Sequence, residues 1–203
     1  MSFLYTILEE MIKGIYSITG NFGLAIIGIT IIIKIILLPL TLKQDKSMKA
    51  MKKIQPQVDK LKEQYKDDPK LLNQKTMELY QQNKINPAGG CIPLLIQLPI
   101  LWALFGVLRI ERGLIPNGST FLWMSLVEPD PYYILPILNG VVSFIQQKLM
   151  GSDNNPQMKN MTYIFPVMMI FISYKMPAGL QIYWLTSSLA GVIQQYLIMK
   201  KGE

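Results

Sequence analysis

A single lysine, Lys34, stands in the middle of the apolar run from Phe22 to Leu42. It lies roughly 3 Å past the centre of that run, too deep for a side chain of about 6 Å to reach either surface of a ~30 Å apolar layer. A lysine at that depth costs ~2.5–3.5 kcal/mol. Because no apolar segment contains Asp or Glu, the sequence predicts a water-filled cavity of neutral polar groups around this ammonium. The alternative is a tolerated lysine that thins the surrounding bilayer.

Neutral polar residues on other apolar segments could line such a cavity. Asn139 and Ser143 are spaced i, i+4, and Ser143 and Gln146 are spaced i, i+3, so all three share one helical face. Each alone more often serves helix–helix contact, but together with Lys34 they predict a polar groove entered from the cytoplasm and closed toward the outside. The candidate groove residues are Lys34, Gln97, Asn139, Ser143, Gln146, Tyr183, Trp184 and Ser187.

The chain lacks the residues of most catalytic and metal sites. It has no His, which excludes Ser-His-Asp catalysis, and one Cys, Cys91, which excludes an intrachain disulfide and a thiolate metal cluster. A dyad of Lys34 with Ser143, Ser187 or Ser188 is conceivable, but nothing in the sequence brings such a pair to hydrogen-bond distance. We therefore expect no enzymatic activity, no metal and no cofactor.

The composition, five apolar segments and the polar residues above together predict an all-α integral membrane protein with five transmembrane helices around a cytoplasm-open hydrophilic groove. Of 203 residues, 50% are hydrophobic and 16% charged, against about 25% charged in soluble domains. The third and fourth spans are short, so either the bilayer thins around them or one of them is re-entrant. Residues 2–19 carry a helical apolar stripe, which predicts a helix lying along the interface or packed on other protein. The predicted order is an interfacial amphipathic helix 1–20, spans 21–42, 89–110, 132–148, 161–175 and 176–199, a cytoplasmic helical hairpin 43–88, an extracytoplasmic loop 111–131, a cytoplasmic loop 149–160 and a cytoplasmic tail 200–203.

The basic residues predict the orientation in a cell (inner or plasma) membrane. Residues 43–88 carry eleven Lys against six acidic residues, and with 148–160 and the tail the same side holds fifteen basic residues. The other side holds four. The positive-inside rule therefore places the N-terminus outside and the C-terminus in the cytoplasm.

The hairpin 43–88 is expected to contain two helices joined at Asp67-Asp68-Pro69, with Asp68 capping the second helix. Its lysines form either a solvated, lipid-attracted surface or a docking surface for an acidic partner such as ribosomal RNA or a targeting factor. Sequence-specific nucleic-acid reading, including that of DNA, is not expected because aromatic residues are sparse. The candidate partner contacts are Lys49, Lys52, Lys53 and Lys60.

Four stretches of the sequence resemble one family of membrane proteins. They are IIIKIILLPLT (31–41), NPAGGCIPLLIQLPILWALF (86–105), DPYYILPILNGVVSFIQQKL (130–149) and MPAGLQIYWLTSSLAGVIQQYLI (176–198). The chain from about residue 3 to 198 resembles the YidC-type membrane protein insertases and the related mitochondrial oxidase-assembly and chloroplast Albino insertases. Bacterial relatives usually carry Arg where this chain has Lys34.

The resemblance implies an insertase and membrane chaperone that moves hydrophobic segments of client proteins into the bilayer without ATP hydrolysis. It implies five core spans around a groove, a functional basic residue at Lys34, and a cytoplasmic hairpin that contributes to activity. The expected partners are nascent membrane proteins, the lipid bilayer, the ribosome and a Sec-type translocation channel. The rival functions are a small transporter, an intramembrane hydrolase and a scaffold. Groove-wall positions that match the family are Gln97, Ser143, Gln146 and Trp184.

Overall fold

The chain folds almost entirely into α-helices. The computed structural model describes residues 2–83, 85, 92–108, 119–150 and 156–201. Cys91, the NPAGGC run, Arg109 and Arg112 lie outside these described residues. In chain order the elements are α1 (Ser2–Thr19), α2 (Phe22–Gln64), α3 (Pro69–Gln82), α4 (Ile92–Leu108), β1 (Thr120–Phe121), β2 (Met124–Ser125), α5 (Ile134–Met150), α6 (Pro156–Ser173) and α7 (Ala178–Lys201).

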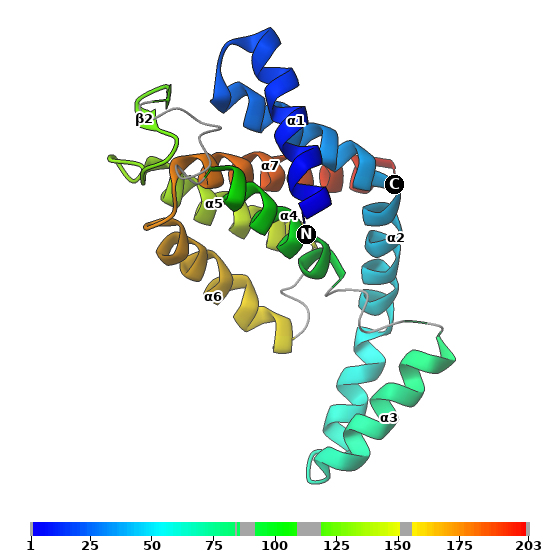
Figure 1. The fold of residues 1–203 in the computed structure, drawn as a ribbon. Helices are drawn as coiled ribbons and strands as arrows, with labels where there is room; N and C mark the ends of the chain where they lie inside the picture. Colours follow the sequence, from blue (N-terminus) through cyan, green and yellow to red (C-terminus); the bar gives the residue numbers. More distant parts are fainter. Residues whose placement is uncertain (1, 84, 86–91, 109–118, 151–155, 202–203) are drawn as a thin grey trace.

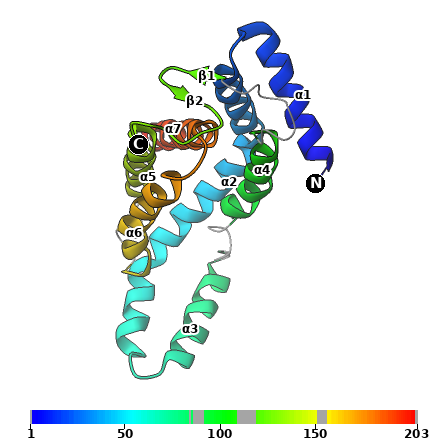
Figure 2. The same cartoon turned by 60° about the vertical axis from the view of Figure 1, so that its left-hand side comes forward.

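The longest element is α2, which joins the predicted first span and the first hairpin helix into one helix of 43 residues. At 1.5 Å per residue it is about 65 Å long, roughly twice the apolar thickness of a bilayer, so half of it must project beyond the bundle. Figures 1 and 2 show this projecting half beside α3. Asn21 caps the start of the helix, where its side chain accepts from the backbone N–H groups of Gly23 (2.8 Å) and Leu24 (3.2 Å).

The second hairpin helix, α3, begins as the sequence predicts. Asp68 is its N-cap and accepts from the Leu71 backbone N–H at 2.9 Å, and Pro69 occupies the first turn. Ile54 and Val58 of α2 are buried at 5% and 4% exposure, where α2 and α3 pack together. Apolar side chains of α2 are therefore buried in the projecting half of that helix.

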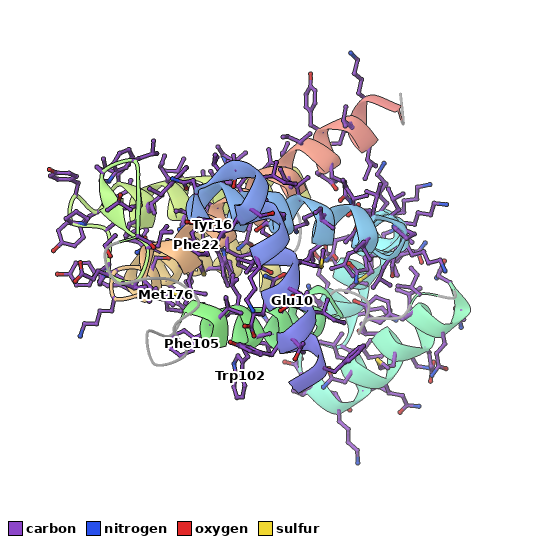
Figure 3. All side chains as sticks on the ribbon, turned by 45° about the horizontal axis from the view of Figure 1, so that its top comes forward. Glu10, Tyr16, Phe22, Trp102, Phe105 and Met176 are labelled. Atoms are coloured by element: carbon purple, nitrogen blue, oxygen red, sulfur yellow. The ribbon has the colours of Figure 1, made fainter. Side chains whose placement is uncertain are left out.

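The bundle is organised around α7, which packs on α2, α4, α5 and β2, while α6 packs mainly on α5 (Figure 1). α1 covers α2 and α4, with the Ile15 side chain over Gly28 and the Tyr5 ring over Gly106. At the turn between α1 and α2, Tyr16 stacks on Phe22 at 3.9 Å (Figure 3). The core includes Leu8, Ile12, Ile26, Ile29, Leu104, Val107, Leu126, Leu180 and Tyr183.

The helices differ in how well their length and apolarity suit a membrane. Among the described residues one helical stretch, Phe22–Met51, is long and apolar enough to span by itself, where the sequence suggests five spans. Gln97–Val107 and Thr162–Ser173 are shorter apolar helices. Polar side chains along α7 lower the hydropathy of that helix despite its 24 residues.

A small β-hairpin, which the sequence did not reveal, lies within the expected loop 111–131. Its two strands pair antiparallel through a two-residue connection in which Leu122 has φ 57°. Behind it, Asp130 is 1% exposed and accepts three hydrogen bonds, from Trp123 Nε1 (2.9 Å) and the backbone N–H groups of Tyr132 (3.1 Å) and Leu135 (2.7 Å). Burial by itself raises the pKa of Asp130, but these donors outweigh it and hold that pKa below its ordinary value.

We predict that Gly140→Ala destabilises the bundle. A methyl group there would overlap Ile170 and come within 3.2 Å of the Pro166 carbonyl oxygen on α6. Overpacking of this kind typically costs ~1–3 kcal/mol, so the thermal midpoint in detergent should fall. Gly14→Ala is the matched control, since nothing lies within 4 Å of its added methyl group and helix propensity favours alanine. Equal midpoints for the two variants would contradict the close α5–α6 packing.

We also predict an acid-dependent loss of stability through Asp130. Because its folded-state pKa is lowered, its stabilisation is complete above the ordinary value of about 3.9 and is lost as the pH falls through the folded-state pKa. Asp130→Asn should therefore lower the thermal midpoint at neutral pH, and the gap to the unaltered chain should close below about pH 4. Glu128→Gln, at an exposed position, should leave the midpoint unchanged throughout. A gap that does not depend on pH would contradict the charge effect.

Candidate functional site

Lys34 is half-buried on α2 and has no counter-ion among the described residues. Its neighbours Ile35 and Ile36 are 63% and 65% exposed on the outer surface of α2. The ammonium therefore sits between an apolar surface and the interior of the bundle without the carboxylate that would neutralise it. Only water or neutral dipoles can then offset the cost of its charge.

Lys34 belongs to a polar stripe on α2, which we define as Thr30, Lys34, Thr41 and Asp45. At 100° per residue these four positions fall within about 60° of one another. Thr30 is 1% exposed and its hydroxyl donates to the Ile26 carbonyl at 2.6 Å. The stripe extends about 22 Å along the helix at 1.5 Å per residue.

The end of this polar stripe faces α7. Gln194 Nε2 on α7 donates to Thr41 Oγ1 at 2.9 Å and to Asp45 Oδ2 at 3.1 Å. Since Lys34 shares the helix face of Thr41, its side chain emerges on the side that α2 turns toward α7. Sequence reasoning missed Thr30, Thr41 and Asp45, although with Lys34 they recur along α2 at spacings of 4, 7 and 4. It also missed Gln194 on α7.

Two of the predicted groove residues meet directly. Gln97 Nε2 on α4 donates to the Tyr183 hydroxyl on α7 at 2.6 Å. Tyr183 is 2% exposed, and Ser187 lies one turn further along the same face of α7 at 7%. Gln194 falls within about 40° of these two positions, so the α7 face that bonds to α4 also bonds to α2.

The predicted residues of α5 lie against α7. Asn139 Nδ2 donates to the Gln181 carbonyl oxygen at 3.3 Å, and the Gln146 amide lies beside Gly191, where an added methyl group would come within 2.7 Å of Nε2. Asn139 Oδ1 and Ser143 Oγ are fully enclosed without a partner among the described residues. Such atoms normally bind ordered water, so this interface can hold water in the bundle.

Among the described residues, the predicted groove residues of α4 and α5 therefore contact α7, and none of them is hydrogen-bonded to Lys34. The half-buried Trp184 and the Lys34 ammonium have no hydrogen bond to another predicted groove residue within the described ranges. No group of three metal-ligating side chains gathers in the part of the chain that the structure describes. On the hairpin, Lys49, Lys53 and Lys60 are exposed, and the Lys52 side chain lies outside the described residues.

The chain is similar over its whole length to known membrane proteins. A family model described as 60Kd inner membrane protein matches residues 14–203. The chain is 64% identical over 206 residues to the membrane protein insertase YidC of Fusobacterium nucleatum, with 100% of both chains covered. It is 44% identical to the membrane protein insertase MisCA of Bacillus subtilis, covering 94% of this chain and 76% of that relative.

A solved structure shows the same fold. It is a crystal structure of an active YidC insertase with the first transmembrane domain resolved, and it matches with a TM-score of 0.78 and 31% identity. The match covers 97% of this chain and 45% of that chain. The resemblance that the sequence motifs suggested is thus confirmed by both sequence and fold.

We predict that Gln97 and Tyr183 are energetically coupled. Tyr183→Phe and Gln97→Leu should each lower the thermal midpoint, because a lost hydrogen bond costs about 1 kcal/mol. The double variant should cost no more than either single one, since both remove the same bond. Tyr196→Phe, an exposed position on the same helix, is the control and should have no effect. Additive losses in the double variant would show that the two side chains act independently.

Proposed function

Since the chain belongs to the YidC family of membrane protein insertases, with relatives of that function matching it from end to end, we propose how its own residues insert a client segment. The polar stripe of α2 and the facing side of α7 form the wall of a hydrated groove, with Lys34 as its only charge at mid-depth. The observation that carries this proposal is the half-buried ammonium of Lys34, which has no counter-ion in the described part of the chain and lies on the face that α2 turns toward α7.

The groove lies within a five-span arrangement formed by the bundle part of α2 with α4, α5, α6 and α7. Fifteen basic residues on the hairpin side support a cytoplasmic hairpin and C-terminus and an outer N-terminus. The apolar surface of α1, including Phe3 at 78% and Ile18 at 87% exposure, supports a position in the outer interface while its other face packs on α2 and α4.

A client segment uses the groove in two parts. Its apolar body contacts lipid along the exposed surface of the bundle, while its short polar or acidic flank enters the hydrated groove and is attracted by Lys34. The flank then crosses a shorter apolar distance than in bare lipid. Partitioning of the client's apolar residues, with the membrane potential where the flank is charged, supplies the driving force.

Short helices reduce that distance further. α5 has 17 residues and α6 has 18, which corresponds to about 26–27 Å, and the apolar part of α6 covers only Thr162–Ser173. A bilayer of ~30 Å must thin to match them. Both the groove and the thinned bilayer therefore shorten the apolar distance that the client flank must cross.

The hairpin of α2 and α3 supplies the cytoplasmic contacts. Lys49, Lys53 and Lys60 project into solvent, where they are available to acidic partners such as a nascent chain, ribosomal RNA or a neighbouring translocation channel. Lys62 and Lys75 are instead paired with Asp59 and Glu78 within their own helices. The three exposed lysines are therefore the stronger candidates for partner binding.

We predict that Lys34→Met impairs and Lys34→Arg preserves insertion of a client with an acidic flank. In reconstituted vesicles, insertion by the Met variant should fall roughly tenfold, which corresponds to ~1.4 kcal/mol of lost attraction. Lys43→Met, an exposed lysine on the same helix, should insert at the unaltered rate. A client with a neutral flank should be less affected. Full insertion of the acidic client by the Met variant would remove the charge from the mechanism.

A further inference from the structure

Residues 119–135 carry a hydrogen-bonded structure that the insertion mechanism does not use directly. Asp130 is its centre, because one carboxylate oxygen joins the Trp123 indole to the Tyr132 backbone N–H and the other accepts from the Leu135 backbone N–H. Trp123 belongs to the β-hairpin connection and Leu135 to the first turn of α5. A single buried carboxylate therefore fixes the hairpin to the start of α5.

The same segment caps α7. The Glu128 carbonyl oxygen accepts from the Ala178 backbone N–H at 2.7 Å, and the Leu126 carbonyl oxygen accepts from the Gly179 backbone N–H at 2.9 Å. These N–H groups belong to the first turn of α7, where a helix has no acceptors of its own. The segment is thus bonded to two helices, to α5 through a carboxylate and to α7 through carbonyls.

The side chains of the segment close the end of the bundle. Met124 and Leu126 are 1% and 0% exposed within the main core, and the Phe121 ring lies against Gly23 at the start of α2 so closely that a methyl group there would overlap it. Figure 1 shows the β-hairpin at the start of α7, away from α3. Apolar side chains therefore fill the space where α2, α5 and α7 begin.

We propose that Asp130 is the positioning residue that keeps the groove closed toward the outer face. This inference rests on the proposed function, in which the groove ends before that face. Asp130 holds the hairpin on α5, the hairpin backbone holds the start of α7, and Met124, Leu126 and Phe121 exclude water between the helices. Without the carboxylate, three donors lose their acceptor and the hairpin is released while the helices remain packed.

The test uses a thiol reporter inside the groove. In a chain with Cys91→Ser, its only cysteine removed, Ser187→Cys places a thiol on α7 about 14 Å along the helix from Ala178. A membrane-impermeant methanethiosulfonate is added to the outer side of intact cells. The unaltered Asp130 chain should stay unlabelled. Asp130→Ala should raise the labelling rate by on the order of tenfold or more, because the closed state loses a carboxylate that satisfies three donors.

Three controls separate closure from general loosening. Glu128→Gln changes an exposed side chain but keeps the carbonyl that caps α7, and it should not raise labelling. Ile12→Cys, at 0% exposure on the buried face of α1, should stay unlabelled in the Asp130→Ala chain if only the outer end opens. Trp123→Phe removes one of the three donors and should give a smaller rise, which provides a second test where Asp130→Ala does not fold.

The outcomes distinguish the two proposals. Outer-side labelling of Ser187→Cys with Asp130 intact would overturn the closed groove and with it the proposed function. An unlabelled reporter in both folded variants, Asp130→Ala and Trp123→Phe, would overturn the role of Asp130 alone. Labelling of Ile12→Cys together with Ser187→Cys would also overturn that role, since the whole bundle would then have loosened.

Discussion

The unpaired charge of Lys34 constrains much of the structure around it. An ammonium at this depth without a carboxylate needs water or neutral dipoles, and an apolar helix packed over it would leave the charge uncompensated. The facing surfaces of α2 and α7 accordingly carry Thr, Ser, Tyr and Gln side chains in place of a continuous apolar seam. The polar stripe of α2 lies on the same face of the helix as Lys34. That one face therefore both contacts α7 and supplies the polar groups that hydrate the ammonium.

The bonds between the helices are of a kind that can be exchanged. Gln97 with Tyr183 and Gln194 with Thr41 are hydrogen bonds between neutral side chains, which in membranes are worth about 0.6 kcal/mol on average and at most ~1.7. Each is within a few RT, so water or a client's polar flank can replace it at little cost. Such contacts keep α2, α4 and α7 together, and in the proposed mechanism they would still let the groove between these helices take up a peptide.

The sequence predicted those features that local patterns determine. The Asp68 cap and the isolated Lys34 each follow from residue spacing or from one residue's chemistry. The bond from Gln194 to Asp45 was missed because the first span was expected to end at residue 42, whereas α2 continues to Gln64 and carries Asp45 on the face of Lys34. The β-hairpin and the role of Asp130 were missed because both depend on backbone partners from α5 and α7, which no local pattern reveals.

The two ends of the bundle are closed by different kinds of bonds. At the end that carries the β-hairpin, a buried carboxylate and two backbone carbonyls accept from donors that have no other acceptor among the described residues, so opening leaves several polar groups unpaired at once. At the other end, the long side chain of Gln194 holds α2 and α7 together, and beyond it α2 continues into the solvent-exposed hairpin. Backbone hydrogen bonds fix the end that carries the β-hairpin. At the other end, the flexible Gln194 side chain can break its hydrogen bond and form another elsewhere. In the groove that we propose, this difference in bonding would let a client enter from one side only, without any moving gate.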